Sequence, residues 1–174
     1  MPAWPRIVTV SAFALMVFVA LVGAAYVNGD VLIDPGGSAG VAVALSWCAA
    51  TAALAAYATS RPGPAAALLV VLTILTAALV VIGDLPGVAP VEAGQAGLMS
   101  ALGVAIALGF LGVPRPVVAG PLLLIVGLAT AGTGGTGAAI ALPVLTAGGL
   151  FGIAAVGDRH PRGRAGGRPR PGLR

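Results

Sequence analysis

The sequence predicts an all-α integral membrane protein: a bundle of six transmembrane helices with both termini in the cytoplasm and a disordered basic C-terminal tail. Two observations predict this class. Hydrophobic residues make up 59% of the 174-residue chain and charged residues only 8%, whereas about a quarter of the residues in a soluble domain are charged. The charges also alternate in sign along the chain between successive apolar stretches.

The distribution of charge predicts which side of the membrane each loop occupies. All nine basic residues are arginine. Arg6 precedes the first apolar stretch, Arg61 separates the second from the third, and Arg115 separates the fourth from the fifth. The intervening gaps carry the acids Asp30, Asp34, Asp84 and Glu92. Because cytoplasmic loops are enriched in Lys and Arg, both termini are expected in the cytoplasm.

Six uncharged stretches approach the roughly 20 residues that a helix needs to cross the hydrocarbon core. In chain order they are 7–27, 40–59, 65–82, 96–113, 117–131 and 138–156. The first exceeds the apolar run of a signal peptide, which has about 7–15 residues, and is expected to be retained. The second is rich in alanine, and the third is the most hydrophobic. Residues 1–157 are therefore predicted to form one membrane domain.

Prolines and glycines separate these stretches. Pro62 and Pro64 flank Gly63 in one break, and Pro114 and Pro116 flank Arg115 in another; proline does not continue a helix. The segment 132–137 matches G-x-G-x-x-G, but it lacks the preceding strand that a dinucleotide site needs, so a turn is predicted. The fifth stretch is short. A re-entrant fifth segment would put the basic tail outside, so two crossings are favoured.

A weak internal repeat is present. Arg6, Arg61 and Arg115 recur at nearly equal intervals, and each adjoins a proline. One interpretation is three helical hairpins in parallel orientation. The other is that any run of similar helices and short loops gives such a period.

Small residues suggest where helices pack. Helix two carries a stripe of Ala42, Ser46, Ala49, Ala53 and Ala56. Helix four repeats Ala101, Ala105 and Gly109, and helix six contains Gly148 and Gly152 in a GxxxG pattern. Small residues let helix backbones approach closely in lipid. The even-numbered helices are therefore expected to be inner or interface helices, while helices one and three face lipid.

Residues 158–174 contain almost no apolar side chain and are predicted to be a disordered cytoplasmic tail. Arginines in such a tail are expected to contact anionic lipid. These are Arg159, Arg162, Arg164, Arg168, Arg170 and Arg174. The tail has no aromatic residue on which bases would stack, so no nucleic-acid partner is expected.

No catalytic, cofactor or metal site is predicted. The apolar stretches contain no ionisable carboxylate, amine or imidazole, and the one histidine, His160, lies in the tail. Metal sites need convergent His, Cys, Asp or Glu ligands, and the one cysteine, Cys48, is predicted to be a packing residue. The chain is therefore expected not to be an enzyme.

Two functions from different classes remain. The favoured one is a non-enzymatic accessory or scaffold subunit that acts through helix contacts with a membrane protein partner or a second copy of itself. The alternative is a small transporter or permease module for a neutral or apolar solute. Pro121 and Pro143, which lie within helices five and six, are its main support, because interrupted helices form transporter sites. Arginine without lysine indicates a GC-rich genome and hence a bacterial cytoplasmic membrane.

Overall fold

The architecture is entirely helical within residues 4–33, 37–85, 91–133 and 135–159, which the computed structural model describes. The helices are α1 (Trp4–Ile33), α2 (Gly37–Ser60), α3 (Pro62–Gly83), α4 (Val91–Gly112), α5 (Pro116–Ala131) and α6 (Gly135–Arg159). Four contain spans long and apolar enough to cross a membrane: Trp4–Gly23, Val41–Ser60, Pro62–Gly83 and Gly137–Gly157. Length and composition thus support membrane association.

Prolines set the ends of several helices. α3 and α5 begin at Pro62 and Pro116, where the missing N–H of proline would have had no helical partner. The first helix was predicted to end at residue 27, before a turn at Asn28, Gly29 and Asp30, and this is wrong because α1 continues to Ile33. One glycine costs a helix only about 1 kcal/mol, and no proline occurs between Pro5 in the first turn of α1 and Pro35.

The other boundary differences are at α4 and α6. α4 begins at Val91, inside the predicted loop before residue 96. α6 extends to Arg159 and so includes the first two residues of the predicted tail. Residues 160–174, and with them the other five tail arginines, lie outside the described residues.

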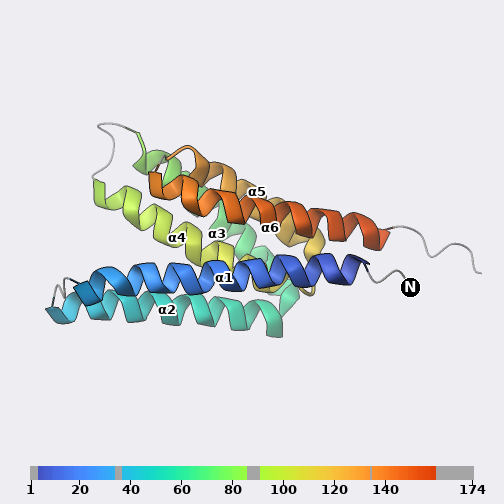
Figure 1. Cartoon of the computed structure of the whole chain (residues 1–174), viewed down its shortest axis with the longest axis horizontal. Helices are drawn as coiled ribbons and strands as arrows, with labels where there is room; N and C mark the ends of the chain where they lie inside the picture. The colour runs from blue at the N-terminus through green and yellow to red at the C-terminus, as the bar shows by residue number, and fades with distance from the viewer. Residues whose placement is uncertain (1–3, 34–36, 86–90, 134, 160–174) are drawn as a thin grey trace, which may run out of the picture.

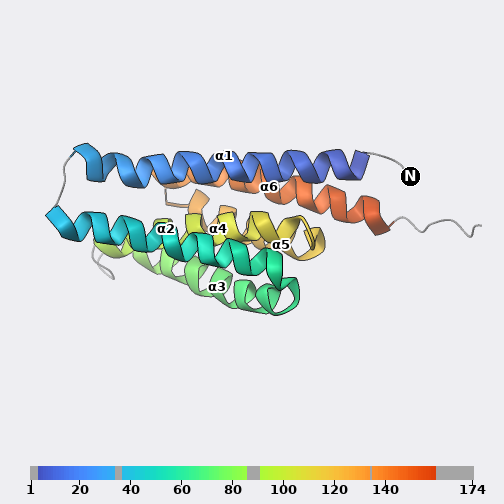
Figure 2. The same ribbon diagram turned by 90° about the horizontal axis from the view of Figure 1, so that it is seen from below.

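The α4 helix is the centre of the bundle. Every residue from Ala101 to Gly109 is buried, and α4 packs against α1, α2, α3 and α5, with smaller contacts to α6. Figures 1 and 2 show α4 enclosed by its neighbours, while α1 and α2 lie along one side. The core of the molecule is therefore a helix surrounded by helices.

Glycines bring the neighbouring helices close to α4. A Cβ atom added at Gly109 would lie 2.6 Å from Cβ of Met16 on α1, and one at Gly97 would lie 3.2 Å from Cα of Val80 on α3. On the α2 side, a Cβ at Gly103 would lie 3.0 Å from Oγ1 of Thr51. The absence of a side chain at these positions is what permits the close approach.

Consecutive helices alternate in direction. Trp4 at the start of α1 meets Gly157 near the end of α6, and the α2–α3 and α4–α5 connections lie at this same end (Figure 1). Arg6, Arg61 and Arg115 therefore gather at one end of the bundle, which we call the arginine end. Asp84 is exposed at the opposite end, after α3. The three arginines and Asp84 therefore lie at opposite ends of the bundle.

The two arginine–proline corners have nearly the same backbone. Arg61 has φ −134° and ψ 68°, and Arg115 has φ −141° and ψ 66°. Each donates its N–H to the carbonyl four residues earlier. The α3–α4 and α5–α6 pairs both form closely packed hairpins, whereas α1 and α2 make few mutual contacts. The parallel-hairpin interpretation of the repeat thus gains support for the last two pairs, and the first pair departs from it.

Replacing Gly109 with alanine is expected to lower the free energy of unfolding by about 1–3 kcal/mol, the usual cost of overpacking. The added methyl group would collide with the Cβ of Met16. The measurement is unfolding in mixed micelles, followed by circular dichroism. The control is Gly152→Ala, because a Cβ there meets nothing within 4 Å; it should gain about 0.5–1 kcal/mol. Equal stability of the two variants would contradict the packing of α1 on α4.

Candidate functional site

The small residues predicted to mediate packing occupy different environments. Ala101, Ala105 and Gly109 are buried in the centre of the bundle, where Gly109 faces α1. These three residues pack against helices of the same chain, so they are not accessible to a partner protein. The expectation for α2 is wrong as regards the bundle interior, because all five residues of its predicted stripe are exposed.

The α2 prediction failed because an alanine-rich helix fits several faces. Among the described residues of α2, the buried ones are Ala44, Thr51, Ala55 and Ala58, which lie on the opposite face of the helix from the predicted stripe. Trp47 fixes this choice, since its indole N–H donates to the carbonyl of Met99 on α4 at 3.0 Å. A hydrogen bond between helices outweighs the slight preference of one alanine face over another.

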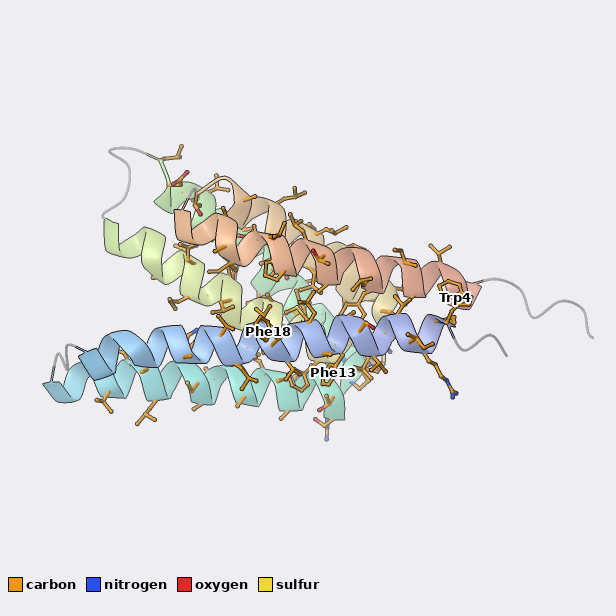
Figure 3. All side chains as sticks on the ribbon, viewed as in Figure 1. Trp4, Phe13 and Phe18 are labelled. Atoms are coloured by element: carbon orange, nitrogen blue, oxygen red, sulfur yellow. The ribbon has the colours of Figure 1, made fainter. Side chains whose placement is uncertain are left out.

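A groove lined by glycines runs along α5 and α6. Its residues, which we call the glycine groove, are Trp4, Gly120, Pro121, Leu124, Gly148, Gly149, Gly152, Ile153 and Val156. Its volume is about 500 Å³, and it opens on the side of the bundle. Trp4 lies beside the C-terminal end of α6 (Figure 3) and marks the arginine end of the groove.

The glycines of this groove divide into two classes. Gly148 is already in contact within the chain, since an added Cβ would lie 3.1 Å from the carbonyl oxygen of Gly120 and 3.1 Å from Cβ of Leu123. At Gly149 and Gly152 an added Cβ would meet nothing within 4 Å. Both glycines of the predicted GxxxG pair therefore lie beside Gly120 of α5, and Gly152 differs from Gly148 in that its missing side chain would point into open space.

The sequence reasoning missed Gly149, Gly120 and Trp4 as parts of this groove. Gly149 follows Gly148 directly, and adjacent glycines on a helix present bare backbone toward two directions. The adjacent pair Gly148 and Gly149 could therefore have indicated from the sequence that α6 has two surfaces without side chains. The contribution of Trp4 comes from the antiparallel packing of α1 on α6, which no local pattern reveals.

A second cavity is an open cleft between α1 and α2, with α4 as its floor. We call it the α1–α2 cleft. Its volume is about 470 Å³. The lining residues are Ala20, Trp47, Cys48, Thr51, Ala52, Ala55, Ala56, Thr59, Ile106 and Phe110. Its walls are almost wholly apolar, and Cys48 is half-buried in one of them.

A solute cavity would be expected to use hydroxyl groups of the apolar stretches, but those of Ser46, Thr73, Thr76 and Thr146 line neither of these two cavities. Ser46 and Thr146 are exposed, and the Thr146 hydroxyl donates to the carbonyl of Leu142 at 2.8 Å. Thr73 and Thr76 are buried in α3. α5 and α6 also continue without interruption through Pro121 and Pro143. The helix interruptions expected at these two prolines are thus not seen in α5 and α6.

No family model matches the chain, and no curated protein or solved structure matches it either. Within the described ranges, no group of three His, Cys, Asp or Glu side chains is placed to hold a metal ion.

Of the predicted lipid-contacting arginines, Arg159 lies at the last position of α6.

Replacing Thr73 with valine is expected to raise the free energy of unfolding by about 1 kcal/mol. The Thr73 hydroxyl is buried without a hydrogen-bond partner, and leaving such a group unpaired is unfavourable. Thr130→Val should have the opposite effect, of about 0.5–1.5 kcal/mol, because the Thr130 hydroxyl donates to Val126 at 3.0 Å. Denaturation in micelles measures both. A destabilised Thr73→Val variant would show that this hydroxyl has a partner.

Proposed function

We propose that this chain is a non-enzymatic accessory or scaffold subunit of the bacterial cytoplasmic membrane, and that its glycine groove receives a transmembrane helix of a partner membrane protein. One observation supports this above others: a Cβ atom added at Gly149 or Gly152 would meet nothing within 4 Å, so both positions are open to another side chain. A partner helix with small residues of its own can approach such a surface closely enough for van der Waals and Cα–H···O contacts.

The rim of the groove fits a helix better than it fits a polar ligand. The side chains beside the glycines are Leu124, Ile153 and Val156, with Trp4 at the arginine end. No charged or hydrogen-bonding side chain other than the Trp4 indole lines it. The groove offers shape and dispersion contacts, which are the forces that join helices in lipid.

A filled bundle with an exposed small-residue groove also favours a scaffold over a transporter. The residues around α4 pack closely, and the two cavities described above open sideways. The alternative, a permease module for a neutral or apolar solute, would draw its support from the α1–α2 cleft, but that cleft is open along one side of the bundle. We therefore place the accessory role first.

We further propose that all six helices cross the membrane, with the arginine end in the cytoplasm. The arginines at that end support this orientation. α5 is the shortest helix, with 16 residues, or about 24 Å. Local thinning of the bilayer accommodates a helix a few ångströms shorter than the hydrocarbon core.

Cysteine labelling tests this topology. In a Cys48→Ala background, Leu85→Cys and Thr133→Cys are expected to react with a membrane-impermeant maleimide in intact cells. Ser60→Cys should react only after the membrane is permeabilised, because Ser60 lies at the arginine end. Labelling of Ser60→Cys in intact cells would reverse the orientation. Protection of Thr133→Cys would mean that α5 does not cross.

The partner is tested by purifying the tagged chain from native membranes in mild detergent and identifying what accompanies it. We expect a stoichiometric membrane protein, and at least about tenfold lower recovery with Gly152→Leu or Gly149→Leu. Such a loss corresponds to about 1.4 kcal/mol. A Cβ added at either position meets nothing within 4 Å, so both variants are expected to fold with the groove filled.

Two controls sharpen this experiment. Ala78→Leu adds the same side chain to an exposed position on α3, outside both cavities, and should leave recovery unchanged. Gly148→Leu is unsuitable as a test, since it would collide with α5. If the wild-type chain purifies without a partner, or if Gly149→Leu and Gly152→Leu leave recovery unchanged, the proposal fails. Recovery of a second, differently tagged copy would identify the partner as the chain itself.

A further inference from the structure

We propose that the α1–α2 cleft binds one hydrocarbon chain of an anionic phospholipid, with the lipid headgroup held at the arginine end by Arg6 and Arg61. This inference rests on the proposed membrane-spanning arrangement. It does not depend on a partner at the glycine groove, which lies on α5 and α6 and involves other residues.

The cleft has the shape of a hydrocarbon chain. Along α2 its lining extends from Trp47 to Thr59, which at 1.5 Å per residue is about 18 Å. A volume of about 470 Å³ spread over this length is long and narrow. The alanines Ala52, Ala55 and Ala56 provide a smooth wall, and the floor is formed by Ile106 and Phe110 of α4.

The cleft exists because α1 and α2 separate. They make few contacts with each other, and Figure 2 shows the two helices diverging toward the arginine end. α1 packs instead on α6 and α4, with Met16 against Gly109 of α4, and α2 packs chiefly on α4, where Trp47 donates to Met99. An aromatic contact supports the floor, since the rings of Phe13 and Phe110 meet edge to face with centroids 5.1 Å apart.

Positive charge lies at the open end of the cleft. Arg61 follows the lining residue Thr59 by two positions and is exposed. On α1, Arg6, Phe13 and Ala20 recur at intervals of seven residues and so share one face; Ala20 lines the cleft, and Phe13 contacts its floor. Arg6 is exposed on that face at the arginine end. Arg61 close to the lining of the cleft, and Arg6 at the same end of the bundle, match an anionic headgroup joined to a hydrocarbon chain.

The proposal is tested with the purified full-length chain by native mass spectrometry, after addition of phosphatidylglycerol or phosphatidylcholine with identical acyl chains. We expect one phosphatidylglycerol molecule to be retained more strongly than phosphatidylcholine. Ala56→Trp, which fills the cleft, should abolish this binding. Ala53→Trp is the matched control, because Ala53 is exposed on α2 and does not line the cleft.

Headgroup recognition is tested separately. Arg6→Gln and Arg61→Gln should each weaken phosphatidylglycerol binding about fivefold, the effect expected of one basic residue at an anionic lipid surface, and leave phosphatidylcholine binding unchanged. Arg115→Gln removes a charge whose guanidinium lies beside Gly63 on α3, and it should have a smaller effect than Arg61→Gln because Arg115 follows no residue that lines the cleft. Lipid bound by arginines beyond α6 is unaffected by Ala56→Trp, so the difference between that variant and the wild type reports the cleft alone.

Cys48 provides a readout that needs no substitution. It is the one cysteine of the chain and lines the cleft, so a bound hydrocarbon chain should slow its alkylation by N-ethylmaleimide. Phosphatidylglycerol should slow the reaction more than phosphatidylcholine does. Equal protection by both lipids, equal retention of both, or unchanged binding in Ala56→Trp would overturn the proposal. Loss of the partner at the glycine groove would leave all of these results unaltered.

Discussion

The arrangement of the bundle depends on how closely other helices approach α4. Gly97, Gly103 and Gly109 face α3, α2 and α1 respectively. α4 thus has a position without a side chain toward each of these three helices, and each can pack closely against it. Lipid offers no hydrophobic drive for helices to associate, and close contact between backbones replaces it. The large apolar side chains are then free to face outward, as on α1 and α3, where Phe18 and Ile74 are about 60% exposed.

Part of this architecture follows from the sequence alone. Six apolar stretches and their prolines indicate six helices, because hydrophobic length and the missing N–H of proline act locally. The face that each helix buries follows only where one face differs strongly from the others. On α4, Ala101, Ala105 and Gly109 are buried, whereas the stripe predicted on α2 is exposed, and the buried face of α2 is the one on which the Trp47 indole N–H reaches α4. The groove and the cleft arise from contacts between distant segments, which no local spacing encodes.

The chain divides its surface between two kinds of recess. The glycine groove lies where α5 and α6 pack tightly, and its floor is bare backbone. The α1–α2 cleft lies where two helices separate, and its walls are alanine side chains around one thiol. Tight packing leaves a recess that suits another helix, while loose packing leaves one that suits a flexible chain. The two recesses lie on different helix pairs and are open to occupation at the same time.

The matching arginine–proline corners have a consequence for how such a chain can change in length. Each corner opens a unit of two helices that leaves and returns to the same side of the bundle. Adding or deleting one complete unit therefore preserves the orientation of everything that follows it, whereas gain or loss of a single helix would invert the remainder. A chain built in this way can grow by whole units without any new signal for insertion, since each unit carries its own arginine.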